Sequence, residues 1–286
     1  MGRADTSESE MKELKGKVAV ITGAGSGFGR ELAILCAREG MHLALADLQE
    51  AGLQGTEALL PAGTQVLKVK CDVSKPAAVE ALAVQTYERF GAAHLLFNNA
   101  GVAGAGPTWT ATLEDWKWMI DVNIMGVVHG IRSFVPRMLK QGDECHVVNT
   151  ASVAGLISVP GSAVYCVTKH SVVTLSECLH HDLQLAKAKI GVSVLTPAFV
   201  NTGIGDSSKT RPAELANANP LGAPFEERVK HALRSGKLSA ADVAKQTMDV
   251  VKAGGFYVIT HKKIKGAIEM RMRDILDERV PSSPMP

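Results

Sequence analysis

An excess of charge of either sign is missing from this sequence, in which 31 lysines and arginines stand against 29 aspartates and glutamates. Binding to nucleic acid or to an anionic membrane surface relies on a basic excess, so this balance argues against both partners. No apolar run approaches the roughly 20 residues needed to cross a bilayer, and the first 15 residues are polar. We therefore expect a soluble, cytoplasmic protein that acts on a small molecule.

Motifs for disulfides, metals and domain linkers are also missing. The five cysteines form no C-x-x-C pair, and no histidine has metal-ligand spacing with a supporting cysteine or carboxylate, so free thiols and no metal are expected. Without a linker or repeat, the sequence predicts one domain over residues 16–280, between flexible tails at residues 1–15 and 281–286. Residues 201–236 are rich in proline and small residues, and are predicted to form an irregular substrate lid.

Short apolar runs do alternate regularly with longer segments of helical period. The predicted strands lie at residues 17–22, 42–47, 65–71, 94–97, 145–149, 191–195 and 256–260. The predicted helices lie at residues 27–39, 48–60, 75–90, 112–140, 161–187, 239–253 and 264–279. This alternation predicts an α/β, doubly wound, seven-stranded parallel sheet with helices on both faces, the Rossmann fold. The crevice of such a sheet lies at the carboxyl ends of its strands.

The first predicted strand runs into a glycine-rich turn, Thr22-Gly23-Ala24-Gly25-Ser26-Gly27-Phe28-Gly29, and a helix follows. Glycine permits positive φ and lets backbone amides approach a pyrophosphate, while the helix N-terminus supplies unsatisfied N–H groups. Asp47, at the end of the second strand, could bind the adenosine ribose hydroxyls or cap the next helix. Asp72, after the third strand, could likewise be a cap or bind the adenine amino group.

Tyr165 and Lys169 are four residues apart in a predicted helix, so their side chains share one face. An ammonium at about 4 Å in an effective dielectric of about 20 supplies about 4 kcal/mol, enough to bring a tyrosine pKa from about 10 towards neutrality. Ser152 follows the fifth strand, where its hydroxyl could bind a substrate carbonyl. These three residues combine a hydrogen-bond donor, an acid/base and a group that tunes its pKa.

Together these residues resemble the short-chain dehydrogenase/reductase family, in its compact single-domain subtype, over roughly residues 14–260. Five motifs carry the resemblance in order: Thr22–Gly29, Asp72, Asn98-Asn99-Ala100-Gly101, Ser152 with Tyr165-x-x-x-Lys169, and Pro197-Ala198-Phe199-Val200-Asn201-Thr202. The resemblance implies a catalytic set of Asn123, Ser152, Tyr165 and Lys169, with Asn123 anchoring a water relay to Lys169. It implies cofactor binding by Gly23, Ser26, Gly27, Phe28, Gly29, Asp47, Leu48, Asp72, Val73, Asn99, Ala100, Gly101, Tyr165, Lys169, Pro197, Val200 and Thr202.

The family usually has glycine where this sequence has Ala198, and the added methyl is expected to narrow the site. The expected substrate pocket is apolar and consists of Ala154, Leu156, Val159, Ala198, Phe199 and Ile204, which favours a bulky, weakly polar secondary alcohol or ketone. Asp47 favours NAD(H) over NADP(H) because its carboxylate would repel a 2′-phosphate, while Arg30 is the residue that could oppose this preference. A homodimer or homotetramer is expected.

Two other functional classes remain open at this point. One is a dinucleotide-binding sensor or scaffold without turnover, which would have no need of a tuned tyrosine. The other is an epimerase or dehydratase with an internally recycled cofactor, whose relatives usually carry a longer substrate domain. Net oxidation or reduction of added NAD(H) separates these classes from a dehydrogenase.

Overall fold

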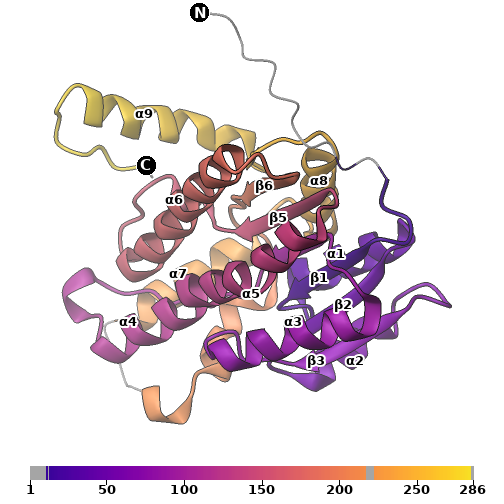
Figure 1. Cartoon of the computed structure of the whole chain (residues 1–286). Coiled ribbons are helices and arrows are strands. Elements are labelled where there is room, and N and C mark those ends of the chain that lie inside the picture. Colours follow the sequence, from indigo (N-terminus) through magenta and orange to yellow (C-terminus); the bar gives the residue numbers. More distant parts are fainter. Residues whose placement is uncertain (1–10, 12, 217–221, 285–286) are drawn as a thin grey trace, which may run out of the picture.

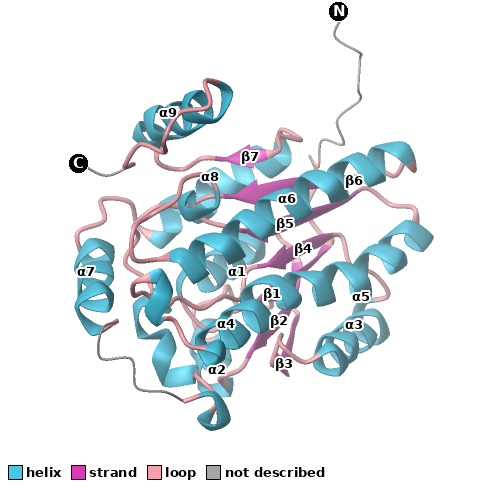
Figure 2. Cartoon of the chain, turned by 90° about the vertical axis from the view of Figure 1, so that its left-hand side faces the viewer, coloured by secondary structure: helices cyan, strands magenta, loops and turns pink. Residues whose placement is uncertain are grey.

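A seven-stranded sheet runs through the centre of the molecule (Figures 1 and 2). The computed structural model describes residue 11, residues 13–216 and residues 222–284. The strands are β1 (Val18–Thr22), β2 (His42–Asp47), β3 (Val66–Lys70), β4 (Leu95–Asn98), β5 (Cys145–Thr150), β6 (Ile190–Leu195) and β7 (Tyr257–Val258). They are all parallel in the order β3-β2-β1-β4-β5-β6-β7, which confirms the predicted doubly wound fold.

Helices cover both faces of this sheet (Figure 2). They are α1 (Gly27–Arg38), α2 (Glu50–Glu57), α3 (Pro76–Phe90), α4 (Leu113–Met119), α5 (Gly126–Gln141), α6 (Ala163–Leu185), α7 (Ala223–Arg234), α8 (Ala240–Lys252) and α9 (Lys265–Leu276). One apolar core joins the sheet to α1 and α8, and a second joins its other face to α3, α5 and α6. The strands β1, β4 and β5 are buried along their whole length, and most of their residues are apolar, as expected for strands covered on both faces.

The predicted helix over residues 112–140 is divided into three parts. Between α4 and α5 lies a π-helical segment, η2 (Ile120–Met125), which contains the buried Asn123. A single π turn inserts one extra residue into the helical register and is common at functional sites. The side chain of Asn123 bonds both the N–H and the C=O of Val102, which joins the π turn to the segment after β4.

Residues 201–236 are more ordered than an irregular loop, so that prediction is wrong for much of the segment. It contains the 3₁₀ turns η4 (Gly203–Thr210) and η5 (Ala213–Leu215), followed by α7. Prolines in this segment suggest a loop, but Pro224 lies in the first turn of α7. Backbone N–H groups in a first turn make no intrahelical hydrogen bond, so proline is tolerated at that position. Residues 217–221, which include Pro220, lie outside the described residues.

The two predicted tails are partly attached to the molecule. Met11 and Leu14 are 1% and 3% exposed and belong to the core beside α1 and α8, because both side chains are apolar. The flexible-tail prediction is therefore wrong for these two residues, while residues 1–10 and 12 lie outside the described part. Near the other end, the Ser282 amide donates to the Asp274 carboxylate at 2.8 Å, which attaches part of the predicted tail to α9. Residues 285–286 are not described.

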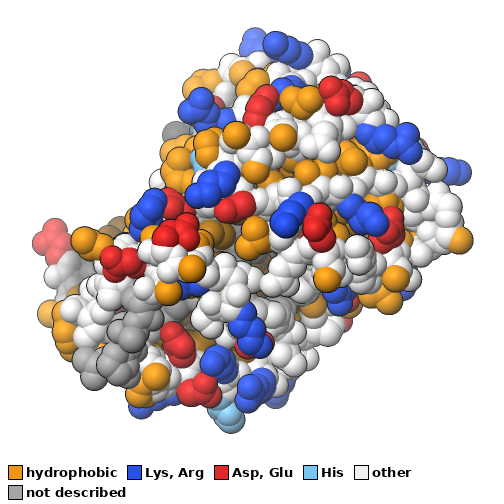
Figure 3. All heavy atoms as spheres, turned by 90° about the horizontal axis from the view of Figure 1, so that it is seen from below, with side chains coloured by type: hydrophobic (Ala, Val, Ile, Leu, Met, Phe, Trp, Pro, Cys, Tyr) orange, Lys and Arg blue, Asp and Glu red, His pale blue; other side chains and the backbone are white. Residues whose placement is uncertain are grey.

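Acidic and basic side chains are interspersed on the face seen in Figure 3, as the balanced composition leads one to expect. Among the described residues, no helix is long and apolar enough to span a membrane. The same described residues hold no group of three or more potential metal ligands.

Candidate active site

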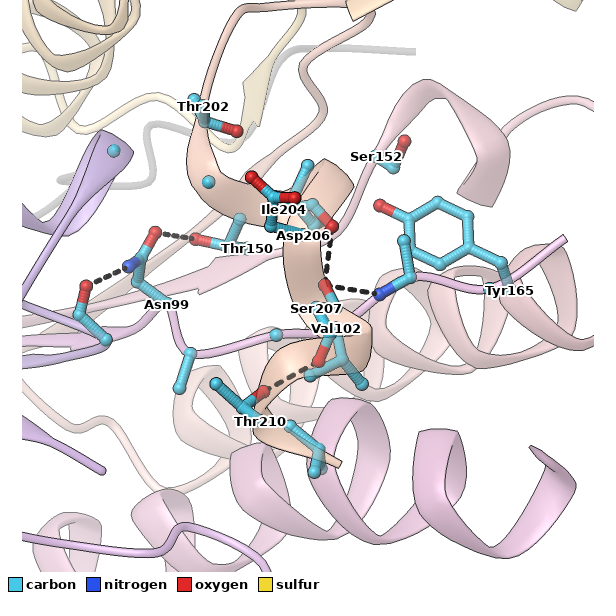
Figure 4. Close-up of a pocket in the computed structure, with 18 of the residues that line it drawn as sticks. Asn99, Val102, Thr150, Ser152, Tyr165, Thr202, Ile204, Asp206, Ser207 and Thr210 are labelled. Atoms are coloured by element: carbon cyan, nitrogen blue, oxygen red, sulfur yellow. Dashed lines mark hydrogen bonds between the residues drawn. The ribbon is translucent and has the colours of Figure 1, made fainter. Parts of the chain in front are cut away.

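A cavity of about 550 Å³ lies where the strands end at their carboxyl side. Its lining comes from the segments that follow the first six strands, and from η4, η5 and α7. Figure 4 shows side chains from these separate segments around it, with Thr202 and Ile204 opposite Ser152 and Tyr165. Because parallel strands present all their carboxyl ends at one edge, residues far apart in sequence meet there.

The glycine-rich turn is closed by the contact of two backbone segments. A Cβ on Gly29 would lie 2.1 Å from the carbonyl oxygen of Gly23, so only glycine allows the start of α1 to approach the end of β1 this closely. Gly29 is itself buried and does not line the cavity, unlike the rest of the predicted cofactor set. The cavity lining includes Gly23, Ser26, Gly27, Phe28, Asp47, Leu48, Asp72, Val73, Asn99, Ala100, Gly101, Tyr165, Lys169, Pro197, Val200 and Thr202.

Asp47 and Asp72 each accept hydrogen bonds from the loop that follows their strand, although the N-caps of α2 and α3 are Gln49 and Lys75. The Asp47 carboxylate accepts from the amides of Gly25 at 2.8 Å and Gln49 at 2.9 Å, so it organises the glycine turn and the start of α2. Asp72 accepts from the amide and hydroxyl of Ser74 at 3.0 and 2.7 Å. Both carboxylates also line the cavity and retain lone pairs for a further donor.

The asparagine motif after β4 connects the central strands. Asn98 donates to the Asn149 side chain at 2.9 Å, within the buried centre of the sheet. Asn99 donates its side-chain amide to the Thr22 carbonyl at 2.9 Å, and the Thr22 hydroxyl accepts from the backbone amides of Asn99 and Ala100. The ends of β1, β4 and β5 are thereby fixed relative to one another beneath the cavity.

Ser152 and the hydroxyl of Tyr165 lie side by side in the cavity lining (Figure 4). Ser152 begins a 3₁₀ turn, η3 (Val153–Gly155), and its oxygen accepts from the Ala154 amide at 3.2 Å. Tyr165 lies in the first turn of α6. Burial raises the pKa of Tyr165 to about 12, although its hydrogen bond with Ser152 acts in the opposite direction.

Lys169 is 2% exposed, one turn beyond Tyr165 on the same helix face. Its Nζ atom donates to the Thr150 carbonyl at 2.9 Å and lies 5.6 Å from the centre of the Tyr165 ring. Burial lowers the pKa of Lys169 to about 8. In the chain without a bound cofactor, burial has the largest influence on the pKa of Tyr165 and raises it, so tuning of Tyr165 by Lys169 stays a prediction for the complex.

Asn123 lies behind Lys169 and does not itself line the cavity. Its Nδ2 atom donates to the hydroxyl of Thr168 at 3.1 Å, and that hydroxyl donates to the Tyr165 carbonyl at 2.8 Å. A Cβ on Gly101 would lie 3.2 Å from Asn123 Oδ1 and 3.4 Å from Lys169 Nζ. Both polar atoms therefore approach the same point beside the Gly101 backbone.

The substrate side of the cavity differs from its sequence-based description. Of the predicted pocket residues, the cavity lining includes Ala154, Val159, Ala198, Phe199 and Ile204. Leu156 is absent from this lining and packs instead against the core formed by α5, α6 and β6, because η3 turns the chain after Ala154. The lining is also less apolar than expected, since it includes the ion pairs Lys117–Asp121 and Lys209–Asp206.

Several lining residues escaped the sequence reasoning, among them Val102, Trp118, Ser207, Leu215, Val229 and Leu233. Trp118 is 4% exposed and packs with Val102 and Leu215 in a small apolar cluster beside Tyr165. No local motif marks these positions. The available signal was amphipathic spacing in residues 223–234, which places Val229 and Leu233 on one face of α7.

The residues around the carboxyl edge of β1 to β4 fit a dinucleotide. The Gly23–Gly29 contact brings the N-terminus of α1 to the cavity, and the Asp47 carboxylate lies where ribose hydroxyls can donate to it. Arg30 does not line the cavity. Its guanidinium instead donates to the Gly25 carbonyl and, at 3.1 Å, to the hydroxyl of Thr56.

Comparison with known proteins gives a consistent result over most of the chain. The family profile described as short chain dehydrogenase matches residues 17–213. A crystal structure of a short-chain dehydrogenase/reductase from Burkholderia phymatum in complex with NAD is 47% identical, with a TM-score of 0.94, and the alignment covers 96% of this chain and 100% of that one.

Two curated relatives have named activities. The CLA biosynthesis dehydrogenase/reductase of Lactiplantibacillus plantarum is 33% identical over 95% of this chain and 97% of its own length. The 1-deoxy-11-beta-hydroxypentalenate dehydrogenase of Streptomyces arenae is 32% identical over 94% of this chain and 90% of its own.

Proposed function

This chain belongs to the short-chain dehydrogenase/reductase family, and we propose that it interconverts a secondary alcohol and a ketone with Tyr165 as the acid/base. The observation that carries the proposal is the placement of Ser152, Tyr165 and Lys169 on one cavity floor, beside the glycine turn. When bound, the nicotinamide cofactor supplies or accepts the hydride.

In the reductive direction, the Ser152 and Tyr165 hydroxyls donate hydrogen bonds to the substrate carbonyl oxygen, and Tyr165 then gives up its proton. A pKa of about 12 keeps that proton on Tyr165 throughout the neutral range, so the chain holds the donor form that reduction requires. Lys169 binds the nicotinamide ribose, and a water relay beside Asn123 and Lys169 returns the proton. The converging positions of Asn123 Oδ1 and Lys169 Nζ support this relay.

The cofactor is NAD(H) in preference to NADP(H). Support comes from the Asp47 carboxylate in the cavity and from Arg30, whose guanidinium is held by Gly25 and Thr56 away from it. A 2′-phosphate beside Asp47 would meet a like charge, at a cost of roughly 1–3 kcal/mol, which is about 5- to 150-fold in affinity. The NAD complex of the Burkholderia phymatum relative is consistent with this choice.

The segment from residue 201 to 236 acts as a substrate lid. Arg211 supports this role because its guanidinium donates to Asp115 on α4 at 2.6 Å and lies 5.1 Å from the centre of the Trp118 ring. Ser207 adds a second attachment, since its hydroxyl accepts from the Ala103 amide at 3.1 Å. These contacts are made by side chains over few residues, which allows the segment to open without disturbing the sheet.

The substrate is a bulky, weakly polar molecule. The apolar cluster of Trp118, Val102 and Leu215 beside Tyr165 supports this choice of substrate.

The protein assembles in the cytoplasm as a homodimer or homotetramer. Light scattering at micromolar concentration tests the assembly, and a monomer would contradict it.

A screen of alcohols and ketones read by NADH absorbance tests the reaction, with Tyr165→Phe as the diagnostic variant. We expect turnover to fall at least about 10²-fold in Tyr165→Phe, as for removal of a general acid, with little change in Tm. Near-wild-type turnover in this variant would contradict the proposed role of Tyr165 as the acid/base. Binding of NADH with no turnover of any compound would instead favour a sensor or scaffold, and turnover without net redox change an epimerase or dehydratase.

A further inference from the structure

One peptide unit at the cavity floor, between Pro197 and Ala198, is held from both sides. Its carbonyl accepts from the Ser152 hydroxyl at 3.3 Å and from the Val153 amide at 3.0 Å. Its N–H, on Ala198, donates to Nδ1 of His261 at 3.2 Å. Because a peptide unit is planar and rigid, a rotation of either end moves the other. Ser152 and His261 are thus connected through the Pro197–Ala198 peptide group.

We propose that His261 is a positioning residue for the reaction, which orients the Pro197–Ala198 peptide and through it the hydroxyl of Ser152. The inference rests on the function proposed above, in which the single Ser152 hydroxyl proton turns from the Pro197 carbonyl to the substrate carbonyl. Pro197 and Ala198 both line the cavity, so the same plane also forms part of the surface against which substrate and cofactor meet.

His261 is fixed at the end of the last strand by the pairing of β6 with β7. Thr196 donates both its amide, at 3.0 Å, and its hydroxyl, at 3.1 Å, to the Val258 carbonyl. Three residues later His261 lies beside Ala198, and the buried Thr260 hydroxyl is 2.8 Å from its Nδ1 atom. β7 is only two residues long, shorter than the five predicted from sequence, and the chain beyond Val258 turns to bring His261 to this position.

The hydrogen bonds determine which tautomer His261 adopts. A backbone N–H can only donate, so Nδ1 must be the unprotonated acceptor and the proton is on Nε2. Nε2 is buried and makes no hydrogen bond within the described chain. A ring that forgoes a hydrogen bond at Nε2 is held by the contacts of its Nδ1 atom with Ala198 and Thr260 and by its packing. Burial also lowers the pKa of His261, which favours the neutral ring that this contact needs.

Three substitutions separate the acceptor role from simple packing. Asparagine places an oxygen close to the position of Nδ1, glutamine places one nearer to Nε2, and leucine provides no acceptor. We expect kcat for ketone reduction to fall about tenfold or more in His261→Leu and His261→Gln, in the range seen when a reacting group is misplaced by a fraction of an ångström to 1 Å. His261→Asn should stay within about threefold of the wild type.

Two further measurements define the effect. NADH binding, followed by fluorescence, should change less than kcat in all three variants, because the glycine turn and Asp47 are untouched. His42→Leu is the matched control, since His42 is a half-buried histidine that stacks on Phe90 at the amino end of β2. This control should retain wild-type kcat and NADH affinity.

The outcomes distinguish the inference from the proposed function. If the wild type reduces a ketone and His261→Leu has the same kcat, the positioning role is overturned and the proposed function stands. Equal losses in the asparagine and leucine variants also overturn it, because an acceptor at Nδ1 would then be irrelevant. If His261→Leu does not fold, the comparison of asparagine with glutamine decides. A wild type that reduces no ketone while binding NADH overturns the proposed function and this inference with it.

Discussion

The cofactor half of the cavity and its substrate half are built by different means. Around β1 to β4, the surface is mainly backbone, closed by the contact of Gly29 with Gly23 and by amides that donate to Asp47 and Thr22. On the substrate side, η4, η5 and α4 meet through side chains, above all Arg211 with Asp115 and Trp118. A surface made of backbone tolerates few substitutions, whereas one made of side chains can change with the substrate.

Lys169 lies where the two halves meet, and its removal should have the largest effect. We expect Lys169→Met to lower turnover by more than about 10²-fold and yet to stabilise the fold at pH 7. The fall in its pKa from 10.5 to about 8 corresponds to about 3 kcal/mol of unfavourable burial, the upper limit of the expected gain.

The pH dependence of this gain has a defined sign. The unfolded chain binds more protons than the folded chain between pH 8 and 10.5, so wild-type stability relative to the variant rises across that window. Urea unfolding at pH 7 and pH 10 measures the change, with exposed Lys140→Met as the control. A stability difference that is the same at both pH values would contradict this account.

Gly29→Ala should break the cofactor half. Its Cβ would lie 2.1 Å from a backbone oxygen that cannot move without the glycine turn, so we expect NADH affinity to fall at least about tenfold and Tm to drop by several degrees. Gly266→Ala, on α9, is the control because a Cβ there meets nothing within 4 Å. It should be neutral or slightly stabilising. Unchanged NADH binding in Gly29→Ala would mean that the turn is not a cofactor cradle.

Asp47→Ala should sharpen the description of the cofactor half, by changing specificity more than chemistry. We expect the ratio of kcat/KM for NADPH to that for NADH to rise about tenfold, since repulsion of a 2′-phosphate is relieved. Because Asp47 also accepts from Gly25 and Gln49, Asp47→Asn is needed as a variant that keeps an acceptor and loses only the charge. If neither substitution moves the ratio, Asp47 only organises the loop.

Arg211→Met tests the substrate half and should have the smallest effect. Loss of the pair with Asp115 should raise KM for the ketone about three- to tenfold, leave NADH affinity unchanged, and speed hydrogen exchange over residues 203–216. Arg234→Met, on the exposed surface of α7, is the matched control. Equal protection of residues 203–216 with and without cofactor and substrate in the wild type would identify a static loop and not a lid.

The difference between the halves also explains what the sequence could predict. Strands β1 to β6 were located within about one residue, because short runs rich in apolar residues alternate with longer segments of helical period. The glycine turn, Asp47 and Tyr165 line the cavity, and the sequence could single them out because backbone geometry and helical spacing demand particular residues at particular intervals. Arg211 and Asp115 are 96 residues apart, and nothing local in either segment indicates that they meet.

The remaining errors arose from context. The π turn at Asn123 leaves no mark on hydrophobic periodicity, since one extra residue is compatible with continuous helix. The high pKa of Tyr165 depends on burial, which the spacing of Tyr165 and Lys169 does not report. Likewise, Leu156 was expected in the pocket from its position after Ser152, but the turn η3 directs it into the core.

The cavity lies at the carboxyl edge of the parallel sheet, and the turns before β4 and β5 lie at the opposite, amino edge. α3 and α5 both end on exposed left-handed glycines, Gly91 at φ 75° and Gly142 at φ 76°, just before β4 and β5 begin. A Cβ at either position meets nothing within 4 Å, but the positive φ strains any side chain there, so labels and insertions belong beside these glycines and not on them. A tether or fluorophore placed at this edge would hold the protein on a surface with its cavity facing solution.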